Sequence, residues 1–345
     1  MVSLSESILN YVVNASWQTI AIVLVAGLGS FLLRTAPARF RHVLWLTALA
    51  ACVIVPLLTA THLWPRLTAT QRSSFDKSVL IPVPTRPAAT GLSGETEPAP
   101  LLDLTKRRTQ VVNTTSESTL LLLGVYALFI VWRVIRLVRF WRKKEKLRRA
   151  ADLKTLSPTA GSIAHRCQTK FGVANIAVVQ SSSARVPYTI GARRPLIVVP
   201  ETFCTANDER LLSVIGHEMA HVARCDYLTN LICELIALPI SFHPLTFVIK
   251  RQIDRARELA CDELVSKRLL PPRLYARSLV WAADVSAQPR TPALMLTMFD
   301  ARILEERVMR LTRSRKMLSR QAARAIASVA LFALGASTVM LSLFS

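Results

Sequence analysis

Four long runs of apolar residues constrain the fold of this chain more than any other feature of its sequence. They cover residues 8–33, 43–64, 119–138 and 322–344 and carry almost no charge. A helix needs about 20 such residues to cross about 30 Å of hydrocarbon. With 51% hydrophobic residues, the sequence therefore predicts a mainly α membrane protein with four transmembrane helices. The first run is too long for a standard cleavable signal peptide, so we expect it to be retained.

Basic residues gather beside some ends of these runs and not beside others, which predicts the orientation of the helices. The first nine residues contain no lysine or arginine, whereas three arginines separate the first two runs, within residues 34–41. Nine more basic residues follow between Arg133 and Arg149. We therefore expect both termini on the extracytoplasmic side of a bacterial inner membrane and residues 139–320 in the cytoplasm.

The same pattern divides the chain into five parts. Two transmembrane helices lie in residues 1–64, and residues 65–117 form a flexible extracytoplasmic loop whose proline, serine and threonine cannot bury a core. Residues 118–138 are the third helix, residues 139–320 an α+β cytoplasmic domain with a small sheet, and residues 321–345 the fourth helix. The net charge of +22 fits contact with anionic membrane lipid. We expect no direct nucleic-acid binding, because no nucleic-acid-binding module accompanies the charge.

The segment His217-Glu218-Met219-Ala220-His221 has the H-E-x-x-H spacing of a metal-dependent hydrolase. We expect it on a helix over about 206–225, with Thr205 and Asp208 as its capping pair. The four-residue step places both imidazoles on one helical face, where they can bind one zinc ion, and Glu218 can take a proton from water. An accidental arrangement on a solvated face is the alternative. The flanking apolar residues argue against it, because unpaired polar groups on a buried helix are costly.

A hydrolytic zinc site needs a third protein ligand and one open position. In Glu258-Leu259-Ala260-Cys261-Asp262 two acids share one helical face. We expect Glu258 to be the third ligand and Asp262 to orient one of the histidines through its other ring nitrogen. An acidic face paired with neighbouring arginines is the alternative. Asp226 and Asp254 are weaker candidates for the third ligand.

Residues 228–249 are almost wholly apolar and separate the two parts of this site. A single membrane crossing would put Glu258 on the opposite side of the bilayer from the histidines, so the segment has to return to the side it left. Pro239 and Pro244 predict the break, and we expect the segment to enter the membrane or to lie along it. A transporter that uses Glu234 and His243 of this segment is the least favoured interpretation of the chain.

The residues before the motif predict a helix over 158–171, a strand over 176–180 and an extended segment over 186–199. Pro187, Gly191 and Pro195 interrupt the extended segment, as in a hairpin. Because proline cannot donate to a ladder, the extended segment fits a sheet edge. A peptide substrate could add to that edge as a further strand, near Ile190, Gly191 and Pro195. The alternative is that this hairpin only covers the core. No residue is assigned to an oxyanion, although Tyr227 and Tyr275 are considered.

Four sequence features in this order resemble the BlaR/MecR family of membrane metallopeptidases: Val186-Pro187-Tyr188-Thr189-Ile190-Gly191, Pro195-Leu196-Ile197-Val198-Val199-Pro200, the H-E-x-x-H segment and the Glu258 to Asp262 segment. The resemblance implies a zincin-like (gluzincin) domain with one zinc ion on His217, His221 and Glu258, and Glu218 as the catalytic residue. It also implies a protein substrate in regulatory signal transduction, such as a BlaI/MecI-like winged-helix repressor, with the chain as antirepressor. Homo-oligomerisation is left open.

Antibiotic-sensing members of that family carry a penicillin-binding domain after their last span. This sequence ends at Ser345, so we do not expect direct β-lactam sensing. Ser74-Phe75-Asp76-Lys77 has S-x-x-K spacing without the partner motifs, and we interpret it as a chance match. The alternative function is a non-catalytic membrane receptor or scaffold with a metal-stabilised domain. Glu218 argues against it, because a structural zinc site needs no general base.

Overall fold

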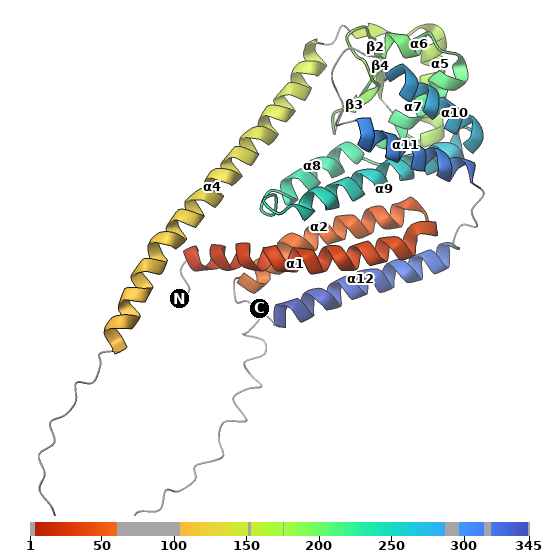
Figure 1. Ribbon diagram of the computed structural model, residues 1–345. Coiled ribbons are helices and arrows are strands. Elements are labelled where there is room, and N and C mark those ends of the chain that lie inside the picture. Colours follow the sequence, from red (N-terminus) through yellow and green to blue (C-terminus); the bar gives the residue numbers. More distant parts are fainter. Residues whose placement is uncertain are drawn as a thin grey trace, which may run out of the picture.

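The protein is mostly helical and carries one small sheet (Figure 1). Our computed structural model describes residues 4–60, 104–150, 153–174, 176–286, 297–313 and 319–343. Most of the expected extracytoplasmic loop and the Ser74-Phe75-Asp76-Lys77 segment lie outside these ranges.

Three of the described helices are long and apolar enough to cross a membrane. The candidate spans are Ile8–Thr35, Ala38–Ala60 and Leu120–Arg142. They belong to α1 (Leu4–Leu32) with the short 3-10 helix that follows it, to α2 (Ala38–Ala60) and to α4 (Leu104–Ala150). The expected fourth span corresponds to α12 (Arg320–Leu343), whose apolar part, Gln321–Ala336, is shorter.

Helices α1, α2 and α12 pack side by side and form one hydrophobic core (Figure 1). Ile22, Leu44, Leu49 and Leu334 are among its buried residues. By contrast, none of the residues in the apolar window of α4 is buried. The Tyr126 hydroxyl of α4 donates to the Pro239 carbonyl at 2.9 Å, which joins α4 to the turn at Pro239.

The apolar segment 228–249 folds as two helices joined by a turn. α8 (Asp226–Ile236) ends before Pro239, and α9 (Leu245–Arg268) begins directly after Pro244. Figure 1 shows α8 and α9 lying side by side, so the chain returns toward the end from which it came. Buried residues of this hairpin, Cys233, Ile240 and Ile249 among them, belong to the same core as α1 and α2.

The polar groups of this hairpin have local partners. Lys250 donates to Glu234 one helix away, and the His243 Nδ1 accepts from the Leu245 backbone N–H at 3.2 Å. Glu234 is therefore paired with Lys250, and His243 is hydrogen-bonded to the backbone of its own turn. These contacts give no support to a transport role for the two residues.

The sheet has the strand order β1-β2-β4-β3, in which only β2 and β4 are parallel. Its strands are β1 (Leu153–Thr155), β2 (Ala177–Ser181), β3 (Tyr188–Ile190) and β4 (Leu196–Pro200). The sequence predicts β2 to within one residue but not β1. The extended segment 186–199 is two strands, because the chain turns at Gly191, whose φ is +100°. A Cβ at Gly191 would meet the Arg194 carbonyl oxygen at 2.7 Å.

Only the first half of that segment occupies the edge. β4 lies between β2 and β3 and is buried along its whole length. The expectation that the prolines keep the entire segment at the edge is wrong for β4, because Pro195 precedes the strand and costs its ladder no hydrogen bond. Of these two strands, β3 is the one at a sheet edge.

A second core lies between the sheet and five helices, and the C-terminal half of α9 adds Cys261 and Val265 to it. The helices are α5 (Pro158–Phe171), α6 (Glu201–Cys204), α7 (Asp208–Ala223), α10 (Pro272–Ser286) and α11 (Thr297–Thr312). The prediction of α5 is confirmed: the Ser157 hydroxyl caps its start, and Gly172 ends it with φ +69°. α7 is capped by Asn207, which accepts from the Arg210 N–H at 3.1 Å, and not by Thr205. Thr205 instead ends α6, where its hydroxyl donates to the Thr202 carbonyl.

The first loop between the membrane helices touches α9 directly. Ala38, at the start of α2, packs against Leu259 and Ala260, and its N–H donates to Glu263 at 3.0 Å. α11 reaches the same loop, because Arg310 donates to the Arg34 carbonyl at 2.6 Å. The helix that carries Glu258 is therefore fixed between the membrane helices and the second core.

Candidate metal centre

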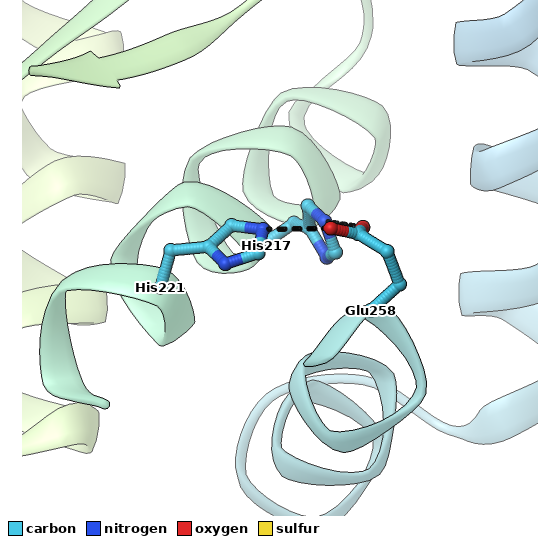
Figure 2. A group of neighbouring side chains, drawn as sticks. All are labelled: His217, His221 and Glu258. Atoms are coloured by element: carbon cyan, nitrogen blue, oxygen red, sulfur yellow. Dashed lines mark hydrogen bonds and ion pairs between the residues drawn. The ribbon is translucent and has the colours of Figure 1, made fainter. Parts of the chain in front are cut away.

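α7 and α9 bring two histidines and one glutamate together (Figure 2). His217 and His221 lie one turn apart on α7, with ring centroids 4.8 Å apart. The Glu258 carboxylate of α9 lies 3.3 Å from the His217 Nε2 and 3.7 Å from the His221 Nε2. One possible ligand atom from each of the three residues lies within 4.8 Å of the others. The structure thus assembles the three expected ligands from helices far apart in the sequence.

His221 is held from behind by Asp226. The His221 Nδ1 lies 2.8 Å from the Asp226 Oδ2, which also accepts from the Arg224 Nε at 3.2 Å. A carboxylate on Nδ1 keeps the proton on that nitrogen and leaves the Nε2 lone pair for a metal. Asp226 thus hydrogen-bonds the His221 Nδ1, whereas Glu258 lies beside the Nε2 of the same ring. Asp254, the other weaker candidate, pairs with Arg257 at 3.0 Å.

A positive backbone φ gives Asp226 this position. α7 ends at Ala223, and Cys225 has a φ of +55° before α8 begins. This left-handed residue reverses the chain within two positions, so Asp226 folds back under His221. Burial alone would lower the pKa of His221, but the hydrogen bond to Asp226 and the nearby carboxylates outweigh it and raise that pKa.

His217 is held through a tyrosine. Its Nδ1 donates to the Tyr275 hydroxyl at 2.9 Å, and that hydroxyl donates to the Asp262 Oδ1 at 2.7 Å. Asp262 itself lies 3.6 Å from the Nδ1, too far for a hydrogen bond. Asp262 therefore reaches the ring nitrogen of His217 that it is expected to orient through the Tyr275 hydroxyl of α10, and not by a hydrogen bond of its own. Burial, followed by the Asp262 charge, raises the pKa of Tyr275 well above its usual value, so the hydroxyl keeps its proton.

α11 contributes an arginine that the sequence does not single out. Arg307 binds both carboxylate oxygens of Asp262, at 2.7 Å from its Nε and 2.8 Å from its Nη2. Its Nη1 also lies 3.6 Å from Glu258. Burial would raise the pKa of Glu258, but His217, His221 and Arg307 hold it well below the usual value. Arg307 is 45 positions from Asp262, on a helix without a motif, so only the fold reveals it.

Glu218 points toward the edge strand. It is 9% exposed, and its Oε2 accepts from the Thr189 hydroxyl of β3 at 2.7 Å. Both residues line a pocket of about 300 Å³, together with Gly191, Pro195, His221 and Glu258. Two of the three residues expected near a substrate thus face this pocket. Ile190 does not, because its side chain is buried at 4% exposure.

The donor set fits zinc. Two imidazoles and one carboxylate are the ligands of one well-known type of hydrolytic zinc site, and here both Nδ1 atoms are already occupied by hydrogen bonds. A second group, His221, Asp226 and Cys261, also has its atoms within reach of one ion. It fits less well, because burial raises the pKa of the Cys261 thiol well above its usual value, and a thiol binds zinc as the thiolate.

The fold and the site together define the class of membrane metallopeptidases, and comparison with known proteins gives the family. Residues 10–311 match the BlaR1 peptidase M56 family. This match covers most of the chain, and the chain belongs to that family.

Its curated relatives are regulatory proteins. The chain is 27% identical over 109 residues to the regulatory protein BlaR1 of Bacillus licheniformis, a match over 31% of the chain and 18% of the relative. It is 29% identical over 92 residues to the regulatory protein BlaR1 of Staphylococcus aureus, a match over 26% of the chain and 16% of the relative. It is also 26% identical over 150 residues to the methicillin resistance mecR1 protein of Staphylococcus aureus, a match over 42% of the chain and 26% of the relative. The chain thus spans about a quarter or less of the length of these relatives.

Proposed function

We propose that this protein is a zinc-dependent metalloendopeptidase of the bacterial inner membrane. The observation that carries the proposal is the convergence of His217, His221 and Glu258 beside a buried glutamate and an open sheet edge. A structural zinc site would need neither the glutamate nor the pocket.

Each residue of the site has a role in this proposal. His217, His221 and Glu258 hold one zinc ion, which when bound polarises a scissile carbonyl and lowers the pKa of water. Glu218 accepts the proton of the attacking water and passes it to the leaving amine. Asp226 orients the His221 ring, and Asp262 orients the His217 ring through Tyr275. The free edge of β3 aligns the peptide.

We further infer that α12 is a fourth transmembrane helix and that both termini are extracytoplasmic. The proposed parts are residues 1–64, 65–117, 118–138, 139–320 and 321–345, with a gluzincin-like domain in the cytoplasm. The packing of α12 against α1 and α2 supports this arrangement. The shared core of the α8–α9 hairpin with α1 and α2 favours a metal site at the inner membrane surface.

The substrate that we propose is a cytoplasmic or membrane protein of a regulatory pathway. The relatives are named as regulatory and resistance proteins, which favours a winged-helix transcriptional repressor. A peptide that adds to β3 has to be locally extended, so cleavage belongs in a linker and not in a folded element.

Purified full-length protein in lipid nanodiscs, incubated with a candidate repressor, tests this proposal. We expect zinc-loaded wild type to cleave it and Glu218→Gln to lose activity by at least about a hundredfold, since general base catalysis contributes 10²–10⁴-fold. Glu209→Gln, an exposed acid on the same helix, is the matched control and should cleave normally. Cleavage by Glu218→Gln, or cleavage that survives a zinc chelator, would contradict the proposal.

A further inference from the structure

The edge strand contacts the glutamate that we propose as the base. Thr189 is the middle residue of the three-residue strand β3, and its hydroxyl donates to the Glu218 Oε2 at 2.7 Å. β3 pairs with β4 on one side only. Its other edge is unpaired within the described part of the chain and borders the pocket.

In β3, the side chains and the backbone can make different contacts. Side chains of successive residues point to opposite faces, while the backbone N–H and C=O groups point sideways along the sheet. Thr189 can therefore hold Glu218 with its side chain while the backbone of β3 offers hydrogen bonds to an added peptide strand. The presence of a threonine at position 189 is not evidence by itself, because β-branched residues favour strands. The short, directed hydrogen bond to a mostly buried carboxylate is the additional observation.

The hydroxyl limits how Glu218 can rotate. The donated hydrogen bond occupies one carboxylate oxygen and leaves the other, Oε1, for a proton in transfer. Without the hydroxyl, a carboxylate that is only 9% exposed loses the donor that holds it in one orientation, and a mobile water from the pocket does not supply the same restraint. Small misplacements of a reacting group cost large factors in rate.

We infer that Thr189 is a positioning residue: its hydroxyl fixes the Glu218 carboxylate and so links the strand that receives the substrate to the proton transfer. This inference rests on the proposed peptidase function. It predicts that the rate of turnover, and not the binding of the peptide, depends on the hydroxyl.

Thr189→Val removes the hydroxyl and keeps the shape and the β-branching, while Thr189→Ser keeps the hydroxyl. We expect Thr189→Val to lower kcat on the order of tenfold to a hundredfold, with KM and zinc content unchanged, for a fluorogenic peptide selected on the wild-type chain. Thr189→Ser should restore most of kcat. Thr202→Val, at an exposed threonine of α6, should behave as wild type. A normal kcat in Thr189→Val, or an equally low kcat in Thr189→Ser, overturns the inference.

A second readout does not depend on turnover. Infrared difference spectra between wild type and Glu218→Gln isolate the carboxylate stretch of Glu218. This band should shift in Thr189→Val and return to the wild-type frequency in Thr189→Ser. An unshifted band overturns the role of Thr189, whether or not the chain cleaves peptides. Absence of cleavage by zinc-loaded wild type would instead refute the peptidase function.

Discussion

Asp226 shows at the scale of single residues how the candidate site depends on groups that are not ligands. It is 4% exposed and binds the Nδ1 of His221 at 2.8 Å. Residues that orient a metal-ligating histidine typically change metal affinity 10–100-fold when mutated. We therefore expect Asp226→Asn to weaken zinc binding by about this factor, measured by competition with a chromophoric chelator. Asp254→Asn, a half-exposed acid paired with Arg257, is the control, and an equal loss there would contradict the role of Asp226.

The same pair predicts how zinc binding depends on pH. The hydrogen bond to Asp226 helps to raise the pKa of His221 above 6.5 in the metal-free protein, and a proton on its Nε2 competes with zinc. Affinity should therefore be highest well above this raised pKa and fall as the pH is lowered through it. Asp226 remains ionised over this range, because His221 and Arg224 lower its pKa despite burial. Calorimetry in buffers of different ionisation enthalpy should detect proton release near neutral pH. Proton-free binding with equal affinity at pH 8 and pH 6 would contradict this expectation.

The residues of the site differ in how far the sequence could predict them. His217, Glu218 and His221 follow from spacing on one helix, which is local information. Glu258 is the favoured third ligand because it and Asp262 share one helical face. The requirement that it lie on the same side of the membrane as the histidines then predicts the return of the chain through 228–249. Tyr275 and Arg307 act through contacts between α9, α10 and α11. No periodicity of the sequence encodes such contacts, so their roles could not be read from it.

Charged pairs join α11 to α9, and the pair of Arg307 with Asp262 is the most buried of them. Arg307 is bidentate to Asp262, whose side chain is 3% exposed. Removing one partner of a buried pair costs about 3–5 kcal/mol, because the other charge stays buried. Arg307→Met should thus lower the Tm by about 10 °C for a domain of this size, followed by intrinsic tryptophan fluorescence. Arg313→Met, at the exposed end after α11, should leave the Tm unchanged, and equal values for the two variants would contradict the pairing.

Element boundaries were predictable where capping residues stand alone and unpredictable where they compete. Ser157 and Gly172 each terminate α5 without a rival. At the start of α7, both Thr205 and Asn207 are residue types that cap helices. Thr205 ends the short helix α6, so Asn207 caps α7. The interruption at Gly191 predicts a hairpin within 186–199, but which of its two strands lies at the sheet edge depends on the pairing of β4 with β2, which no local pattern shows.

At the scale of the whole molecule, the account depends on which side of the membrane each part occupies. Green fluorescent protein folds into a fluorescent state in the cytoplasm but not after export. A fusion of green fluorescent protein after residue 313 should therefore fluoresce, and the same fusion after residue 345 should be dark. Alkaline phosphatase fused after residue 345 should be active. Fluorescence from both fusions would show that α12 does not cross the membrane and would contradict the four-helix arrangement.

X-ray absorption at the zinc edge of the purified protein tests whether one zinc ion binds to His217, His221 and Glu258. We expect nitrogen and oxygen neighbours of zinc at about 2.0–2.2 Å, with the scattering of two imidazoles and no sulfur. A sulfur atom at about 2.3 Å would place the ion on Cys261 in the second candidate group and contradict the account.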